Sequence, residues 1–411
     1  MLLYIDPGTG SMLFTILIGV FGAALYSLRM LFIKLRFVIS GGRAKDISMK
    51  KLPIVIFADD KRYWNIFSPI CRELDKRGKD VVYMTASPND PALDNPYEHV
   101  KGEFIGEGNK AFAKMNYLNA SIVLSTTPGL DVYQWKRSKN VDYYVHIFHA
   151  ASDVTIYRMF GVDYYDALLL SGSFQIQQIR KLEKKWHLPE KEIQKVGLPY
   201  MDDMRKRLLS EEKNESSDRT VLLAPSWGIN AIFSVYGGRM IDALLETGYH
   251  VIIRPHPQSF TSEKDLIDSL MKKYPESDRL EWNRDNDNFD VLNRSDILIS
   301  DFSGVIFDYT LVYDKPVIYT DTEFDKGPYD AHWLDEPLWT YEVLPKLGER
   351  LTEDSIGNIK ELIDKCISDP KYAEGREQAR SECWEHIGEG AVNAADYIEQ
   401  KYNELTEKKA S

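Results

Sequence analysis

This 411-residue sequence is poor in cysteine and has fewer positive than negative residues, 51 against 63, and each of these features disfavours a class of protein. The three cysteines, Cys71, Cys366 and Cys383, are too far apart for a CxxC metal pair and too few for a disulfide framework, which indicates a reducing compartment. The formal net charge of −12 disfavours nucleic acid as the main partner, because the phosphate backbone is bound by basic surfaces. We therefore predict no nucleic-acid partner.

Several nucleotide-binding and hydrolase motifs are also missing. The sequence has no Walker-type phosphate loop and no GxGxxG fingerprint, which disfavours ATPase and NAD chemistry, and it has no serine nucleophile elbow. The acidic segment 285–288 lacks the glycine and the distal glutamate of a calcium loop, so we expect a solvated turn there. We predict no cofactor and no metal site.

A long apolar run is found only at the N-terminus. Residues 12–28 are uncharged, and the run resumes after Arg29 as far as Ile33, which at about 1.5 Å per residue matches a hydrocarbon core of about 30 Å. No Lys or Arg precedes it, and the residues that follow it include Lys34, Arg36, Arg43, Lys45, Lys50 and Lys51. The positive-inside rule then places the N-terminus outside and the body in the cytoplasm. We predict a single transmembrane helix, an anchor within residues 1–36, in the cell membrane; a buried hydrophobic hairpin is the alternative.

The rest of the sequence alternates short apolar runs with helical patterns. Strands are expected at 53–58, 80–84, 121–125, 143–148, 167–170, 220–224, 250–253, 296–299 and 316–319. Helices are expected at 64–77, 238–246, 264–273 and 390–408. Buried strands that alternate with helices predict an α/β fold with parallel sheets, and the polar stretch 210–218 divides the pattern in two. We predict a linker at 37–50, Rossmann-like domains at 51–209 and 219–389 that face a cleft, and a C-terminal helix at 390–411.

Two motifs lie where strands of the C-terminal half end. Arg254-Pro255-His256-Pro257 follows the strand at 250–253, and Ser300-Asp301-Phe302-Ser303-Gly304 follows the strand at 296–299 and precedes a helix-like run over 305–313. Ligands of parallel sheets bind at the carboxyl ends of strands, where helix N-termini offer N–H groups to anions. The two motifs therefore predict a phosphate-handling site, with plain turn and capping roles as the alternative. Asp308 can cap, pair with a cation or hold a ribose.

His146 and His149 lie at the end of the strand at 143–148. Residues three apart on a strand face opposite sides, so the two imidazoles do not converge on one metal, and a zinc site is disfavoured. We interpret His146 as a core residue. His149, in the loop, is the candidate general base.

With these residues in view, the body resembles the family of CDP-glycerol:poly(glycerophosphate) glycerophosphotransferases, the teichoic-acid primases and polymerases. The resemblance covers roughly residues 146–397. Four motifs carry the resemblance. The family's A-P-T-W is similar to residues 224–227, and its R-x-H-P is similar to residues 254–257. Its S-D-x-L-I-T-D-Y-S-S-x-x-F-D is similar to residues 296–308, and its G-x-P-R-x-D is similar to Gly197-Leu198-Pro199 with Asp202. His149 falls where the family has W-H-G. Phe148 and Ala150 depart from that motif, Tyr200 replaces the usual Arg, and Gly228 replaces a basic residue.

The resemblance implies a GT-B arrangement with an acceptor-side N-terminal domain and a nucleotide-donor C-terminal domain. It implies transfer of glycerol phosphate, or a related polyol phosphate, from CDP-glycerol to a hydroxyl of a lipid-linked cell-surface polymer at the cytoplasmic membrane, releasing CMP. His149 and His256 would be catalytic. Substrate would be bound by Arg254, Ser226, Trp227, Ser300, Asp301, Ser303, Gly304 and Asp308. The alternatives are a GT-B glycosyltransferase that uses a nucleotide sugar, and a membrane-tethered binding protein whose catalytic site has decayed. The oligomeric state is left open.

Overall fold

The computed structural model describes residues 51–211, 219–285, 287–322, 324–335 and 337–410. The described residues from Leu52 onward belong to one compact unit. The anchor predicted within residues 1–36 and the linker at 37–50 lie outside the described residues. Within the described part of the chain, no helix is both long and apolar enough to cross a membrane.

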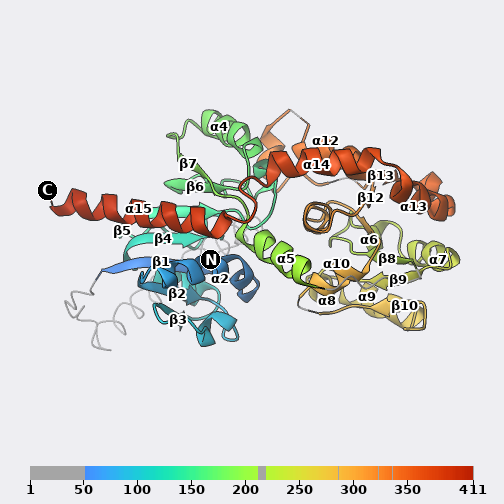
Figure 1. Cartoon of the computed structure of the whole chain (residues 1–411), viewed down its shortest axis with the longest axis horizontal. Coiled ribbons are helices and arrows are strands. Elements are labelled where there is room, and N and C mark those ends of the chain that lie inside the picture. The colour runs from blue at the N-terminus through green and yellow to red at the C-terminus, as the bar shows by residue number, and fades with distance from the viewer. Residues whose placement is uncertain (1–50, 212–218, 286, 323, 336, 411) are drawn as a thin grey trace, which may run out of the picture. The chain divides into compact units, whose positions relative to one another are not determined.

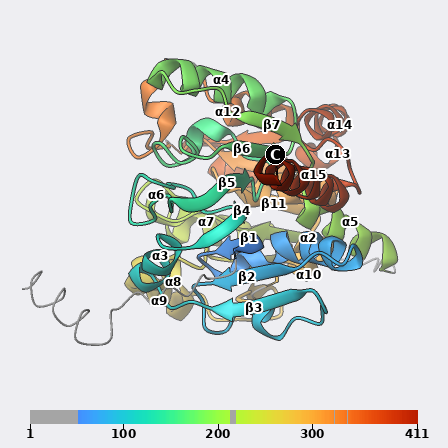
Figure 2. The ribbon, with the colours of Figure 1, turned by 90° about the vertical axis from the view of Figure 1, so that its left-hand side faces the viewer.

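The first sheet has seven parallel strands in the order β3-β2-β1-β4-β5-β6-β7 (Figure 1 and Figure 2). Its strands are β1 (Leu52–Ala58), β2 (Val81–Thr85), β3 (Val100–Phe104), β4 (Asn119–Ser125), β5 (Asn140–Ile147), β6 (Ala167–Leu170) and β7 (Glu192–Lys195). From β1 the chain runs to β3 at one edge and then returns to β4, which pairs with the other side of β1. The carboxyl ends of β1 and β4 are therefore the topological switch point, where ligands of such sheets bind.

Helices connect these strands, as parallel pairing requires. They are η1 (Lys61–Tyr63), α2 (Trp64–Lys76), η2 (Pro91–Asp94), α3 (Asn109–Met115), η3 (Val154–Ile156), α4 (Phe174–Trp186) and α5 (Pro199–Ser210). The longest of them carry apolar side chains on one face; in α2 these are the buried Ile66, Phe67, Ile70 and Leu74.

The second sheet has six parallel strands in the order β10-β9-β8-β11-β12-β13. They are β8 (Thr220–Leu223), β9 (His250–Ile253), β10 (Leu280–Trp282), β11 (Ile297–Ser300), β12 (Val317–Thr320) and β13 (Gly348–Leu351). Here β8 and β11 are the adjacent central strands, so the switch point lies at their carboxyl ends. The α/β fold with two parallel Rossmann-like sheets is confirmed.

The helices of the second half follow the same alternation. They are α6 (Ile232–Val235), α7 (Gly238–Glu246), α8 (Ser259–Ser262), α9 (Lys264–Lys273), α10 (Phe289–Arg294), α11 (Val305–Phe307), η4 (Asp308–Val312), η5 (Asp330–Trp333), α12 (Trp339–Leu347), η6 (Glu353–Asn358), α13 (Ile359–Ser368), α14 (Lys371–Cys383) and α15 (Gly390–Ala410).

Both faces of both sheets are buried, which explains why the strands read as continuous apolar runs. In β1, Val55 and Phe57 belong to one buried cluster, and Ile54 and Ile56 belong to the cluster on the opposite face. In the second sheet, Leu222 and Leu223 of β8 are divided between opposite faces in the same way.

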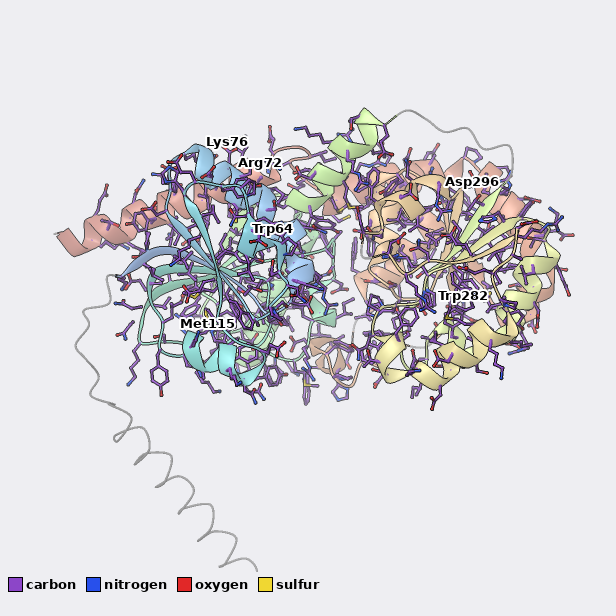
Figure 3. All side chains as sticks on the ribbon, turned by 90° about the horizontal axis from the view of Figure 1, so that it is seen from below. Trp64, Arg72, Lys76, Met115, Trp282 and Asp296 are labelled. Carbon is purple, nitrogen blue, oxygen red and sulfur yellow. The ribbon has the colours of Figure 1, made fainter. Side chains whose placement is uncertain are left out.

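The last helix, α15, returns from the second half of the chain to the first sheet (Figure 1). Its Ala394, Ala395 and Ile398 pack in the same buried cluster as Ile54. Asp202 on α5 fixes the start of α15, because its carboxylate accepts hydrogen bonds from the backbone N–H groups of Gly388 at 2.7 Å and Gly390 at 2.9 Å. Arg72 of α2, labelled in Figure 3, forms an ion pair of 2.7 Å with Asp203, the next residue of α5.

Candidate active site

His149 lies in the loop after β5, half-buried, at the carboxyl end of the first sheet. Its Nδ1 atom is 2.9 Å from the hydroxyl of Thr126, which follows β4, and 3.3 Å from the hydroxyl of Tyr157. The ring of Tyr63 lies 5.2 Å from the imidazole, centroid to centroid. Burial, with a smaller contribution from the charge of Arg62, lowers the pKa of His149 to about 4. The imidazole is therefore neutral at pH 7 and able to accept a proton.

His256 lies after β9 of the second sheet. The backbone N–H of Gln258 donates to its Nδ1 atom at 3.1 Å, so the neutral ring carries its proton on Nε2. Burial and then Arg62 lower the pKa of His256 to about 4, and Glu263 opposes them. At pH 7 this imidazole is a neutral donor. The ring of Trp227, 47% exposed, lies 6.4 Å from it.

The two imidazoles come from different sheets but share one charged neighbour, Arg62. Its guanidinium acts on the pKa of both His149 and His256. Arg62 belongs to η1, directly after β1, and so lies at the switch point of the first sheet. We did not select this residue from the sequence, although its position just beyond the strand at 53–58 was a usable signal.

Arg254 is held by neighbours within its own half of the chain. One Nη atom donates to the side-chain oxygen of Asn283, and the other donates to the backbone carbonyl of Asp285 at 2.7 Å. Burial lowers the pKa of the Arg254 guanidinium, which nevertheless stays charged.

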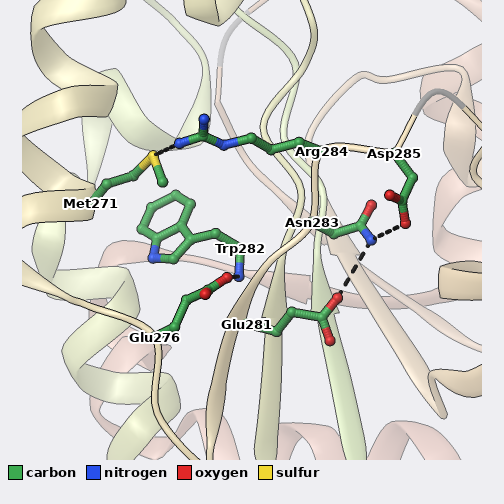
Figure 4. Close-up of a pocket in the computed structure, with 7 residues that line it drawn as sticks. All are labelled: Met271, Glu276, Glu281, Trp282, Asn283, Arg284 and Asp285. Carbon is green, nitrogen blue, oxygen red and sulfur yellow. Dashed lines mark hydrogen bonds between the residues drawn. The ribbon is translucent and has the colours of Figure 1, made fainter.

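Asn283 and Asp285 also line a pocket of about 540 Å³ at the β10 edge of the sheet (Figure 4). The Asn283 amide bonds to Glu281 at 3.4 Å and to Asp285 at 2.8 Å. The lining is Met271, Glu276, Glu281, Trp282, Asn283, Arg284 and Asp285. Three carboxylates against one guanidinium make this pocket unfavourable for a phosphate.

Ser300 and Asp301 are buried inside the second half. The Ser300 hydroxyl donates to the carbonyl of Ala224 at 2.6 Å. The Asp301 carboxylate accepts from the backbone N–H groups of Ser226 at 2.9 Å, Ile232 at 3.2 Å and Phe302 at 2.8 Å. These contacts hold together the loops that follow β8 and β11. Ser300 and Asp301 therefore support the shape of the site from within the protein.

Ser226 is itself buried, so Trp227 is the exposed residue of its motif. Ser303 and Gly304 precede the short helix α11, with Gly304 as its N-cap. Gly304 is exposed with open space in front of it, because a Cβ atom there would meet nothing within 4 Å. No described residue bonds the Ser303 hydroxyl. These two residues have room for a ligand, and whether they bind one stays a prediction.

Asp308 is paired with Tyr200, whose hydroxyl donates to its carboxylate. Burial raises the pKa of Asp308 to about 6. Tyr200 is one of the residues that depart from the pattern of the resembled family, so a neutral phenol stands here where an Arg would bring a charge. The sequence leaves open a cap, a cation pair or a ribose contact for Asp308, and the partner found in the structure is a neutral phenol and not a cation.

His146 is fully buried among the rings of Phe148, Tyr157 and Tyr165, at centroid distances of 5.0, 5.7 and 4.9 Å. Both ring nitrogens are unpaired, and burial lowers the pKa of His146 to about 3. It is a neutral core residue. Among the described residues, no group of three or more His, Cys, Asp or Glu side chains is arranged to hold a metal ion.

Comparisons with known proteins add to this geometry. A model of the family described as CDP-Glycerol:Poly(glycerophosphate) glycerophosphotransferase matches residues 149–389, more than half of the chain. Among proteins with curated descriptions, none matches the sequence.

Solved structures share the fold at low identity. The wall teichoic acid polymerase TagF, in a structure soaked with CDPG, aligns with a TM-score of 0.58 at 17% identity, over 93% of this chain and 99% of that one. A UDP-GlcNAc 2-epimerase from Methanocaldococcus jannaschii aligns with a TM-score of 0.52 at 13% identity, over 85% and 99% of the two chains. Os79 from O. sativa, in complex with UDP, aligns with a TM-score of 0.54 at 10% identity, over 85% and 100%. These likenesses show a GT-B-like fold.

Proposed function

The chain belongs to the CDP-glycerol:poly(glycerophosphate) glycerophosphotransferase family, as a glycerophosphotransferase-like enzyme, and we propose that it transfers glycerol phosphate from CDP-glycerol to a hydroxyl of a lipid-linked cell-surface polymer. The observation that carries this proposal is the pair of neutral imidazoles, His149 and His256, that come from separate sheets and share Arg62 as a neighbour. The family match includes both histidines. Support for CDP-glycerol as the donor comes from the family description and from the TagF structure soaked with CDPG.

The hydrogen bonds of the two histidines suit them to different roles. When the Nδ1–H of His149 donates to the Thr126 hydroxyl, its Nε2 lone pair is free to accept the proton of the acceptor hydroxyl. His256 accepts at Nδ1 and therefore presents an Nε2–H, which donates to an oxygen of the donor diphosphate. His149 is thus the general base, and His256 is the hydrogen-bond donor.

The transfer is then a displacement at the phosphorus that carries glycerol. The acceptor oxygen forms a bond to this phosphorus while the bond to the bridging oxygen breaks, and CMP leaves with that oxygen. The acceptor proton passes to His149. In phosphoryl transfer the protein contributes chiefly position and charge stabilisation, so neutral donors and cations around the diphosphate suffice. We expect no metal requirement, and activity retained in EDTA would support this expectation.

Substitution of each histidine tests the assignment. We expect His149→Ala and His256→Ala each to lower turnover by about 10²–10⁴-fold, the usual effect of losing a positioned acid or base. The matched control is His250→Ala, because His250 lies at the amino end of β9, four residues before Arg254. All three variants should keep the thermal melting profile of the wild type. Near-normal turnover in either active-site variant removes that histidine from the mechanism.

Labelled donors distinguish this function from its alternatives. CDP-glycerol with ³²P at the glycerol-bearing phosphorus should transfer label to the polymer, whereas a GT-B glycosyltransferase would transfer only the carbohydrate of a labelled UDP-sugar. A thermal-shift screen with CDP-glycerol, CDP-ribitol and UDP-sugars ranks the donors, since a ligand that binds the native state raises the melting temperature. No shift with any of them would favour a decayed binding protein.

We also propose that residues 1–36 anchor the enzyme in the cytoplasmic membrane with its body in the cytoplasm. The support is the uncharged run at 12–28 and the absence of Lys and Arg before it. The full chain should stay in the membrane fraction after alkaline carbonate extraction, and a C-terminal tag should be protected from protease in intact spheroplasts. Release by carbonate, or digestion of the tag, would contradict the proposal.

A further inference from the structure

The residues predicted to bind the diphosphate do not supply enough positive charge for it. Under the proposed function the donor carries two phosphate charges. Both active-site imidazoles are neutral at pH 7, because their pKa values are lowered to about 4. Arg254 directs its two Nη atoms to Asn283 and to the carbonyl of Asp285. A further cation is needed at the site.

Arg62 is held at the carboxyl end of β1, where the first sheet has its switch point. Asp60 caps η1 by accepting the Arg62 backbone N–H at 2.9 Å, which fixes the backbone of this short turn. The guanidinium lies over the ring of Tyr63, 5.7 Å from its centroid, and Tyr63 in turn lies 5.2 Å from His149. Arg62, Tyr63 and His149, the candidate general base, therefore form a connected group.

The charge of Arg62 acts on both imidazoles. Among the described residues it is the one cation that contributes to the lowered pKa of His149 and of His256, and Glu263 is the charged group that opposes it at His256. A single guanidinium thus acts on a base from one sheet and on a hydrogen-bond donor from the other, as a group that binds the transferring phosphoryl group would.

We propose that Arg62 is a phosphate-binding residue of the transfer site, whose guanidinium leaves Asp60 for the non-bridging oxygens of the donor diphosphate. In the structure, Arg62 pairs with Asp60 at 3.1 Å, and the two side chains are 61% and 39% exposed. Exposed ion pairs of this kind contribute little to stability, so the pair is readily exchanged. A phosphate accepts two parallel N–H bonds from a guanidinium in a less hydrated setting, which favours the exchange.

This inference rests on the proposed function for the identity of the donor, and it adds a residue that the family match does not include, because the match begins at residue 149. A phosphate-binding Arg62 also explains how a site with two neutral histidines can bind a doubly charged diphosphate. Burial, with a smaller contribution from the charge of Arg62, keeps His149 deprotonated and able to act as a base. Once the diphosphate is bound, its charge offsets that of Arg62.

The test compares Arg62→Gln and Arg62→Lys with Lys61→Gln, which removes the same charge from the neighbouring residue of η1. We expect Arg62→Gln to lower kcat/KM for CDP-glycerol by about 10²–10³-fold, as for other lost charge-stabilising donors. Arg62→Lys should recover part of this loss, and Lys61→Gln should stay within about twofold of the wild type. Arg62 is exposed, so all three variants should fold with unchanged melting temperatures.

Two further measurements separate this inference from the proposed function. NMR titration of the ligand-free protein should show the pKa values of His149 and His256 rising in Arg62→Gln, whatever the donor is. Inorganic pyrophosphate should bind about tenfold or more weakly to Arg62→Gln than to Lys61→Gln. If the wild type does not use CDP-glycerol but both effects are found, the assignment of the donor is wrong and the assignment of Arg62 as a phosphate-binding residue is supported. If the wild type is active while Arg62→Gln keeps kcat/KM within about threefold, the inference about Arg62 is wrong.

Discussion

Removal of the Asp301 carboxylate is expected to destabilise the second half of the protein. Asp301 is 2% exposed and receives backbone N–H groups from Ser226, Ile232 and Phe302, which belong to the segments that follow β8 and β11. Asp301→Ala leaves three donors without their acceptor inside the protein. A buried donor left unsatisfied costs about 1–3 kcal/mol, so the loss of all three hydrogen bonds costs about 3–9 kcal/mol.

The lower end of this range is the better expectation. Burial is the largest influence on this carboxyl and raises the pKa of Asp301, although its hydrogen bonds act in the opposite direction. The ionised group therefore carries a desolvation cost that its removal relieves. We expect a loss of about 3 kcal/mol for Asp301→Ala and about 1–2 kcal/mol for Asp301→Asn, which keeps one of the two oxygens.

Equilibrium unfolding in urea measures these changes. The matched control is Ser300→Ala in the preceding residue, which loses one hydrogen bond to the Ala224 carbonyl and should cost about 1 kcal/mol. If Asp301 contacted substrate and did little else, Asp301→Ala would raise KM and leave stability unchanged. A destabilisation below that of Ser300→Ala would refute the structural role of Asp301.

Three other predictions rest on the packing and the pKa values. His146→Phe should remove a source of acid lability, because the pKa of His146 in the folded protein is about 3, below the ordinary 6.5. The stability that the neutral imidazole contributes is complete above pH 6.5 and is lost as the pH falls toward 3. The melting temperature should therefore fall less across this pH range in the variant than in the wild type. Gly375→Ala should lower the free energy of unfolding by about 1–3 kcal/mol, because a Cβ atom would lie 1.9 Å from the carbonyl oxygen of Lys346. Gly357→Ala is the control: a Cβ atom there would meet nothing within 4 Å, so the free energy of unfolding should change by less than about 0.5 kcal/mol. The acid limb of kcat/KM should lie near pH 4, because the base must be deprotonated and burial lowers the pKa of His149 to about 4; a limb at pH 6.5 would contradict this.

The central strands were predictable from the sequence, and the edge strands were not. The expected strand at 167–170 coincides with β6, that at 250–253 with β9, and the other expected strands differ from the structure by a few residues at their ends. The four strands that sequence reasoning missed, β3, β7, β10 and β13, are the four sheet edges. Edge strands such as β7 (Glu192–Lys195) are half-exposed and carry charged residues, so they show no continuous apolar run.

The candidate site was predictable in its motifs and only partly in its contacts. Sequence reasoning placed His149 and His256 at strand ends and interpreted His146 as a core residue, and the structure has them there. It named Asp301 as a substrate-binding residue, which stays a prediction, and the structure adds that the carboxylate is bonded to backbone N–H groups 69 and 75 residues away in the chain. It predicted that Arg254 binds the phosphate, and the structure adds that this guanidinium is bonded to residues about thirty positions later in the chain. It did not predict a role for Arg62.

The sequence by itself determined the alternation of buried strands and helices, the family, and which motifs stand at the carboxyl ends of strands. These properties are local, because a strand buried on both faces and the residues that come after it are read from adjacent positions. The tertiary structure alone decided which groups act on one another: the charge of Arg62 on two imidazoles, the Tyr200 hydroxyl on Asp308, and the backbone N–H groups of the surrounding loops on Asp301. Each of these interactions joins segments far apart in the chain, and the burial of the groups sets their protonation states. No local sequence pattern therefore predicts them.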